Sequence, residues 1–170
     1  MKNKNTIKIV IGVALVIVAS LVVFLILKIK KPEEIKIGVT KEEVISIFDK
    51  NKYQYTINTI SDEYIEVSTK NEKISIKNIK GTLIVGIENE KVTIVYFSPN
   101  IDEKKKSQQI ERLTKYLINL YGDPYEEERQ GGIYKHWFKG DIRISFGYSL
   151  DENSEIQTRI AWILQNMSKE

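Results

Sequence analysis

Residues 82–96 have the sequence TLIVGIENEKVTIVY, which consists of two alternating runs on either side of a polar break. Apolar side chains stand at alternate positions in both runs, and the break between them, Glu88–Lys91, is charged. Alternation with a period of two is typical of a strand that buries one face, and a short polar break between two such runs predicts a hairpin turn. The segment therefore predicts two antiparallel strands, around which the rest of the sheet is built.

Similar runs on both sides of this hairpin predict the remaining strands. Upstream, three short alternating runs complete a meander of about five strands. Downstream, three further runs predict a second group of strands, and the polar residues Glu126–Gly132 are expected to form a loop before them. The upstream runs contain Tyr53–Ile57, Ile65–Val67 and Ile74–Ile76, and the downstream runs are Tyr134–Lys139, Asp141–Tyr148 and Glu155–Leu164.

Two helices are predicted from the signals at their ends. Thr40 and Glu43 have the spacing of a capping box, which predicts a helix that begins directly after Thr40. A second helix is expected from about Ile101 to Tyr121, because apolar residues recur there at the spacing of one helical face. Asn100 is the expected cap at its start, and Gly122 is suited to the residue just past its end.

Two segments of similar sequence suggest an internal duplication. Ile79–Val85 and Phe138–Ile144 each carry a Lys-Gly pair, at which a break between strands is expected. One interpretation is a diverged helix-plus-meander unit that occurs twice, over residues 38–99 and 100–166; the other is that Lys-Gly turns between apolar strands recur by chance. A duplication predicts either two sheets that each carry one helix or one long sheet with two helices.

An apolar run near the N-terminus, Ile9–Leu27, contains no charged side chain. As a helix it would extend about 28 Å, close to the ~30 Å hydrocarbon core of a bilayer. The run predicts a transmembrane signal anchor within residues 1–31, followed by a short charged linker over residues 32–37. We expect the N-terminus in the cytoplasm and the folded domain on the extracytoplasmic side; a cleaved signal peptide is the alternative.

Composition narrows the classes of partner and of chemistry. The net charge is +3, but the lysines of residues 1–31 supply it and the folded part is slightly acidic, which argues against a nucleic-acid partner. The chain has no cysteine, which excludes disulfides and thiolate metal sites. Together with the patterning, this predicts an α+β fold class, in which a transmembrane helix is followed by antiparallel sheet packed by two helices.

The sequence contains no assembled set of catalytic or ligand residues. The single histidine, His136, lies in a predicted strand with no other metal-ligating residue adjacent to it, so a structural or surface role is expected. The chain has no G-x-S-x-G, no phosphate-binding loop and no HExxH motif. Asp151–Glu155 imitates the start of a calcium loop, but Ile156 replaces the required glycine. We therefore assign no catalytic, cofactor-binding or metal-ligating residue and expect no cofactor.

Aromatic side chains are concentrated in the predicted C-terminal strands. Trp137 lies between Lys135 and Lys139, on what should be the more solvated face of its strand. Aromatic residues with basic neighbours can form a binding surface for a protein, a glycan or peptidoglycan, or they can pack in the core; core packing is the favoured interpretation. The group consists of Tyr134, Trp137, Tyr148 and Trp162.

Residues 37–44 have the sequence IGVTKEEV, which resembles the opening G-[MV]-T-x-x-x-V of the BamE or SmpA family of small outer-membrane assembly lipoproteins. That α+β fold is also similar to the tandem-repeat β-lactamase inhibitor proteins. The chain lacks the lipid-bearing cysteine and the Gly-x-Pro expected after the first helix, although Gly122-Asp123-Pro124 follows the second. The resemblance implies helices on an antiparallel sheet in a protein that binds rather than catalyses, and it transfers no partner or functional residue.

Three functions are compatible with these features. The first is a non-enzymatic, single-pass membrane protein whose extracytoplasmic α+β domain binds a protein or an envelope component. The second is an inhibitor or immunity-type module at the cell surface, and the third is an envelope hydrolase that uses dispersed carboxylates and His136. Because the sequence assembles no catalytic set, binding is the leading prediction.

Overall fold

The structure is a computed structural model that describes residues 35–70, 74–129, 131–150 and 156–165. These residues form two α-helices, one short 3-10 helix and nine strands in a single sheet. The helices are α2 (Lys41–Lys50), the 3-10 turn (Glu103–Lys105) and α3 (Lys106–Tyr121). The strands are β1 (Tyr55–Thr59), β2 (Tyr64–Thr69), β3 (Ile74–Ile76), β4 (Ile79–Glu88), β5 (Lys91–Pro99), β6 (Tyr125–Arg129), β7 (Gly132–Lys139), β8 (Ile142–Tyr148) and β9 (Arg159–Leu164).

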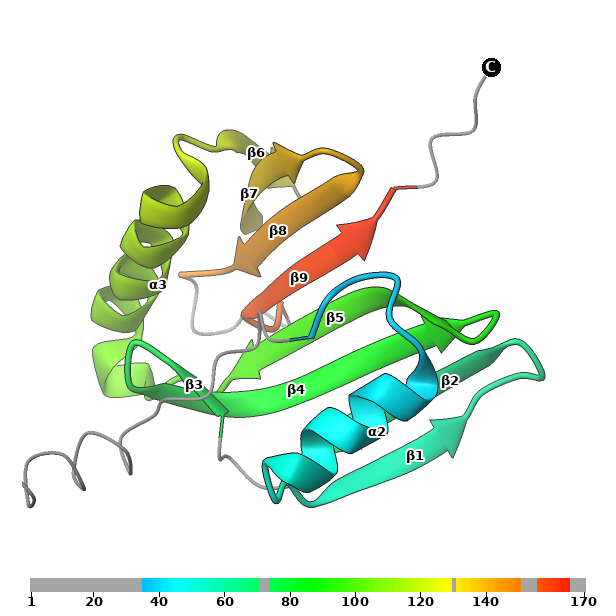
Figure 1. Cartoon of the computed structure of the whole chain (residues 1–170). Helices are drawn as coiled ribbons and strands as arrows, with labels where there is room; N and C mark the ends of the chain where they lie inside the picture. The colour runs from blue at the N-terminus through cyan, green and yellow to red at the C-terminus, as the bar shows by residue number, and fades with distance from the viewer. Residues whose placement is uncertain (1–34, 71–73, 130, 151–155, 166–170) are drawn as a thin grey trace, which may run out of the picture.

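The sheet has the strand order β1-β2-β4-β5-β9-β8-β7-β6, and β3 pairs with the remaining length of β4 (Figure 1). Each half consists of a helix followed by strands that run in chain order from the edge of the sheet inward. The halves meet where β5 pairs with β9, from Ile94 opposite Ile163 to Phe97 opposite Ile160. The sheet is therefore continuous through both halves, and every strand pair in it is antiparallel.

The predicted fold class needs correction at its N-terminal end. None of the helices in the described part of the chain combines the length and the apolar composition that a bilayer crossing requires. The longest, α3, has 16 residues, and charged side chains such as Glu111 and Lys115 occupy its exposed face. The apolar run Ile9–Leu27 lies outside the described residues. The structure therefore does not support the predicted transmembrane helix or the signal anchor that depends on it, and it consists mainly of antiparallel sheet with two helices.

The first helix begins where the capping pattern predicts. Thr40 Oγ1 accepts a hydrogen bond from the Glu43 backbone N–H at 3.3 Å, and the Glu43 carboxylate accepts one from the Thr40 N–H at 2.8 Å. This reciprocal pair satisfies two backbone donors that the first turn of a helix leaves without partners. The cap directs α2 across the sheet, where Val44 and Phe48 are fully buried.

Replacing Thr40 with alanine is expected to lower the free energy of unfolding by about 1 kcal/mol, because the Glu43 N–H loses its acceptor. Urea denaturation of the purified chain measures this change. Thr59→Ala, at the exposed end of β1, is the matched control and should leave stability almost unchanged. Equal losses in the two variants would show that the cap contributes nothing.

The second helix begins later than predicted. Asn100 is not its cap, because the Asn100 N–H donates to Lys80 O at 2.7 Å and so prolongs the sheet. Asp102 instead caps a 3-10 turn by accepting from the Lys104 N–H at 3.1 Å, and α3 starts only at Lys106. The predicted end is confirmed: Gly122 has φ +85° and donates its N–H to Ile118 O. A left-handed residue just past a helix is the position that glycine fills best.

The expected loop at Glu126–Gly132 is wrong in its first part, because β6 occupies Tyr125–Arg129 at the edge of the sheet. The strand pairs with β7 along its whole length. Its side chains are charged on both faces, so no alternation of apolar and polar residues marks it. A short, charged edge strand resists further pairing with other chains, which gives this composition a structural reason.

The core lies between the helices and one face of the sheet, and a single cluster of buried side chains extends through both halves. Trp137 belongs to this cluster and is only 3% exposed. Its Nε1 donates to Gly122 O at 2.7 Å, and its cross-strand partner is the buried Ile144. The favoured core packing is therefore confirmed for Trp137, and the expectation that its face of the strand is the more solvated one is wrong, because the register of β7 with β8 turns this face toward the core. Tyr148 and Trp162 are also buried, which confirms core packing for them.

The two Lys-Gly pairs occupy different structural positions. Gly140 lies in the turn between β7 and β8 and has φ +58°. Gly81 lies inside β4, opposite Pro99, so the break expected at Lys80-Gly81 is wrong. The physical reason is that β3 folds back and pairs with this end of β4, which keeps it extended. Whether the two halves arose by duplication stays a prediction.

Candidate interaction face

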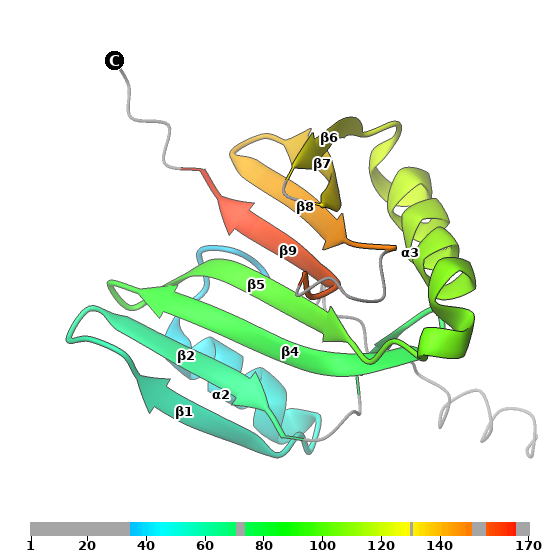
Figure 2. The same cartoon turned by 180° about the vertical axis from the view of Figure 1, so that it is seen from behind.

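The face of the sheet opposite the core has no helix over it among the residues the structure describes. In Figure 2 α2 lies behind β1 and β2, so this face is in front. Successive side chains of a strand point to opposite faces, and the cross-strand pairs group Tyr96 and Ser145 with Ala161 on this side. We call this surface the open face. Its aromatic and charged members include Tyr64, Glu66, Glu88, Tyr96, Tyr125, Glu127, Arg129, Tyr134, His136, Phe138, Arg143 and Arg159.

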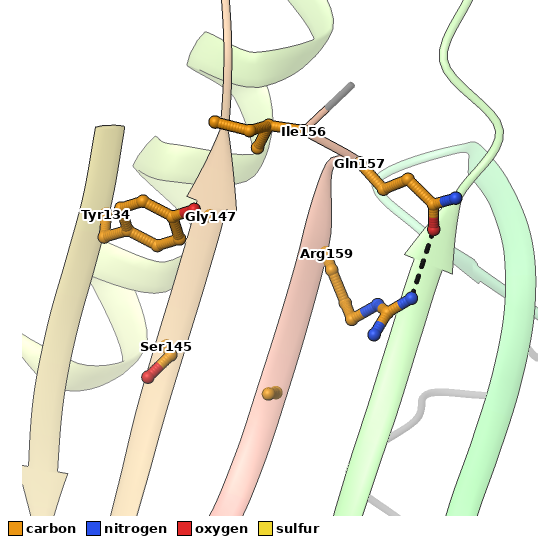
Figure 3. Close-up of a pocket in the computed structure, with 7 residues that line it drawn as sticks. Tyr134, Ser145, Gly147, Ile156, Gln157 and Arg159 are labelled. Atoms are coloured by element: carbon orange, nitrogen blue, oxygen red, sulfur yellow. Dashed lines mark hydrogen bonds between the residues drawn. The ribbon is translucent and has the colours of Figure 1, made fainter. Parts of the chain in front are cut away.

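A hollow of about 400 Å³ lies on the open face over β7, β8 and β9 (Figure 3). Tyr134 forms one side of it, and the ring lies over Gly147 of the neighbouring strand. A Cβ atom at Gly147 would come within 2.8 Å of the Tyr134 Cε1 atom. Glycine is therefore required for the ring to lie flat against the sheet. Ser145 and Arg159 also line the hollow.

Two arginines on the open face have buried polar atoms without partners. The Nε atoms of Arg143 and Arg159 are inaccessible to solvent and form no hydrogen bond within the described residues. The Arg159 guanidinium stands 5.1 Å from the centre of the Tyr96 ring, and its Nη2 donates to Gln157 Oε1 at 3.1 Å. In the described part of the chain neither arginine forms an ion pair with a carboxylate. A buried donor without a partner costs free energy, so each arginine is a candidate for binding an anion.

His136 has no metal-ligating residue adjacent to it in the sequence, but the fold supplies two polar partners. Its Nδ1 lies 2.9 Å from Ser145 Oγ, and its Nε2 lies 3.7 Å from Glu127 Oε2. The Tyr125 ring stacks on the imidazole at a centroid distance of 6.4 Å. A Ser-His-Glu row therefore crosses β8, β7 and β6. The row could not be predicted from the sequence, because only the register of three strands brings these residues together.

The row resembles a catalytic triad in composition but differs in geometry. The 3.7 Å separation of Glu127 from His136 exceeds hydrogen-bond distance. Ser145 lies inside β8, which pairs with β7 on one side and β9 on the other. The backbone N–H groups around Ser145 are therefore engaged in the sheet and do not form an oxyanion hole. The hydroxyl and imidazole are best described as a polar part of a binding surface.

Burial and the neighbouring arginines favour the neutral form of His136. Burial lowers the pKa of His136, and the positive charge of Arg143 lowers it further. Glu127 acts in the opposite direction, while Arg129 adds a smaller lowering effect. Burial disfavours the charged imidazolium, and a nearby cation does the same. The imidazole can therefore accept or donate one hydrogen bond to Ser145 at neutral pH, depending on its tautomer.

The pKa of His136 should be measurably below 6.5 in the folded protein. The unfolded chain then binds more protons than the folded chain as pH falls through 6.5, so the free energy of unfolding decreases on acidification. His136→Gln removes this proton and should show a shallower decrease between pH 7 and pH 5. Titration of the imidazole by NMR and urea denaturation at both pH values check the two statements. A midpoint at or above 6.5 would contradict the first.

The other half of the open face carries Glu66 and Glu88 and a similar contact of tyrosine with glycine. The Tyr64 hydroxyl lies against Gly86, where a Cβ would come within 2.5 Å of its oxygen. Burial, together with the charge of Glu66, raises the pKa of Tyr64 to about 12. The hydroxyl donates to Glu66 Oε1 at 3.3 Å. The open face therefore carries carboxylates on β2 and β4 and arginines on β8 and β9.

Metal binding has no visible basis in the described part of the chain. No group of three histidine, cysteine, aspartate or glutamate side chains there could hold a metal ion. The calcium-like segment Asp151–Glu155 lies outside the described residues. No catalytic, cofactor-binding or metal-ligating residue is predicted from the sequence, and this prediction stays untested.

Similarity to known proteins adds no further constraint on the site. No family model, no curated protein and no solved structure matches this chain. The resemblance of residues 37–44 to the BamE or SmpA family therefore stays a prediction, and the function must be argued from the open face itself.

Proposed function

We propose that this protein is a non-enzymatic binding module that uses the open face to bind a partner protein. The carrying observation is the combination of tyrosine, phenylalanine and arginine side chains on a sheet face that no described helix covers. Aromatic residues and arginine are the types most enriched among residues that dominate binding energy. An exposed patch of this composition is typical of an interaction site.

The strongest support comes from large aromatic side chains exposed on the open face, on β7 and on the edge strand β6. Phe138 is 62% exposed and Tyr125 is 65% exposed. Most of the apolar surface of these two rings is in contact with water in the free protein. Covering it with a partner would therefore contribute about 25 cal/mol of binding free energy for each Å² buried. Packing of Tyr125 on the imidazole of His136 limits the freedom of its ring, which reduces the entropy lost on binding.

Crosslinking followed by affinity purification of the full chain tests this proposal. Phe138→Ala and Tyr125→Ala should each reduce recovery of the captured partner. Leu120→Ala is the matched control, because Leu120 is a large apolar residue that is 47% exposed on α3, away from the open face. Equal recovery with all three variants would contradict a role for the open face. The extracytoplasmic location expected from the sequence stays a prediction, which protease treatment of intact cells checks.

An inhibitor or immunity-type module is the narrower form of the same proposal. It requires that the captured partner be an enzyme or toxin whose activity falls when the complex forms. Adding the purified chain to that partner measures the effect directly. A partner whose activity is unchanged at saturation would leave general binding in place and remove the inhibitor interpretation.

A hydrolase is the second candidate, and the Ser145–His136–Glu127 row is the observation that favours it. A fluorophosphonate probe should label an activated serine and should fail to label the Ser145→Ala variant. We expect no labelling of Ser145, because the imidazole lacks a close carboxylate and the site lacks oxyanion donors. Specific labelling would replace the binding proposal with an enzymatic one.

A further inference from the structure

We infer that the hollow beside Arg159 binds a carboxylate side chain from an acidic segment of the partner protein. This inference rests on the proposed function and adds the chemistry of the partner to it. Its basis is a guanidinium that the sheet holds in place and leaves short of acceptors, next to a hollow that has the size of a side chain or short segment.

The position of Arg159 is fixed from two sides. Its guanidinium lies over the Tyr96 ring, and Gln157 accepts one hydrogen bond from Nη2. Figure 3 shows this bond and places the Arg159 side chain across from Tyr134. A guanidinium has five N–H donors in a planar fork that matches the two oxygens of a carboxylate. Within the described residues, Gln157 is the one side chain that accepts a hydrogen bond from it. A ligand carboxylate can therefore replace water at the remaining terminal N–H groups.

The surroundings of Arg159 would strengthen an ion pair. Tyr134, Ile156 and Ala161 line part of the hollow with apolar surface. A bound segment that covers this surface would exclude water and so strengthen the attraction between opposite charges. The hydroxyl of Ser145 adds a polar group. The Nε atom of Arg159 is buried without a hydrogen bond among the described residues, so a carboxylate in the hollow would meet the terminal nitrogens of the guanidinium.

A second arginine extends the same surface along β8. Arg159 pairs with Gly147, and Arg143 lies four positions earlier in that strand on the same face. At about 3.3 Å per residue, Arg143 and the Gly147 position beside Arg159 are separated by roughly 13 Å along β8. The Arg143 Nε is also buried without a hydrogen bond among the described residues. An extended segment with two carboxylates at this separation would satisfy both arginines.

The charges elsewhere on the open face favour a protein carboxylate over a phosphate polymer. Glu66, Glu88 and Glu127 lie on the same face and would repel a continuous chain of phosphates. Nucleic-acid surfaces carry a basic patch over the whole contact area, whereas here the arginines of the open face lie on β6, β8 and β9, and glutamates lie among them and on β2 and β4. A protein segment that presents acidic residues to β8 and β9 fits this division of charge.

Peptide binding to the purified full chain tests the inference. The probe is a capped decapeptide of alternating glutamate and serine, and the comparison probe replaces every glutamate with glutamine. NMR titration should show shifts at the backbone amides of Ser145, Gly147 and Arg159 with the glutamate peptide only. Arg159→Gln should weaken binding about tenfold or more, because a charge-assisted pair is lost. Arg112→Gln on α3 is the matched control for charge and should bind as the unchanged protein does.

Three results would overturn the carboxylate pocket: no binding of the glutamate peptide, equal binding of the glutamine peptide, or tighter binding of inorganic phosphate or oligo-dT. Thermal unfolding of each variant verifies that the fold is intact, and Arg159→Lys, which keeps the charge, should retain part of the affinity. The partner capture described above separates this failure from that of the proposed function. Capture that depends on Phe138 but not on Arg159 would reject the pocket and keep the open face.

Discussion

Replacing Phe97 with alanine is expected to lower the free energy of unfolding by about 3–5 kcal/mol, the cost of removing a large aromatic side chain from a closed core. Phe97 is fully buried, and in β5 it lies opposite Leu83 of β4 and Ile160 of β9. A cavity there opens at the strand pair that joins the two halves of the sheet. The loss should therefore affect the whole domain and not one half of it.

Chemical denaturation followed by two probes measures this effect. Both tryptophans, Trp137 and Trp162, lie in the second half of the sheet, so their fluorescence reports on that half. Backbone amide signals of α2 report on the first. One shared transition at a lower denaturant concentration is the expected result. Phe138→Ala is the matched control, because Phe138 is 62% exposed and its loss should cost little. Separate transitions for the two halves would contradict a shared core.

Local signals predicted the central hairpin and the first helix. The hairpin of residues 82–96 is confirmed as β4 and β5, with Asn89 and Glu90 in left-handed conformations at φ +49° and +65°. The capping box at Thr40 and the glycine end at Gly122 are confirmed as well. Each of these features depends on residues a few positions apart, so the sequence states them directly.

Features that depend on distant strands could not be predicted in the same way. The β5–β9 pair joins strands far apart in the chain, and no local sequence pattern predicts this pairing. The same pair decides that Tyr96 and Arg159 lie on one face, where the guanidinium covers the ring. Strand β6 was not predicted, because its side chains are charged on both faces and show no alternation of apolar and polar residues. The open face therefore could not be predicted from the sequence, because the pairing of distant strands decides which residues share it.

Gly81→Ala is expected to destabilise the protein at or above the upper end of the ~1–3 kcal/mol range for overpacking. A Cβ at this position would lie 2.3 Å from the Ser98 backbone oxygen and 2.8 Å from the Phe97 ring. A ring can move, but the Ser98 carbonyl belongs to β5 and is fixed by the sheet. The strain must therefore shift backbone beside the strand that joins the two halves.

A double-mutant cycle separates these two contacts. If the ring alone caused the strain, Phe97→Ala would make room for the new methyl group and cancel most of the cost of Gly81→Ala. Because the carbonyl contact remains, we expect a substantial part of that cost to persist in the Phe97→Ala background. Gly140→Ala is the comparison, since nothing lies within 4 Å of its Cβ position and only the left-handed backbone, costing about 1–2 kcal/mol, opposes it. A Gly81→Ala variant as stable as the unchanged protein would show that β4 and β5 can separate locally, and the close pairing at this end of the sheet would then be wrong.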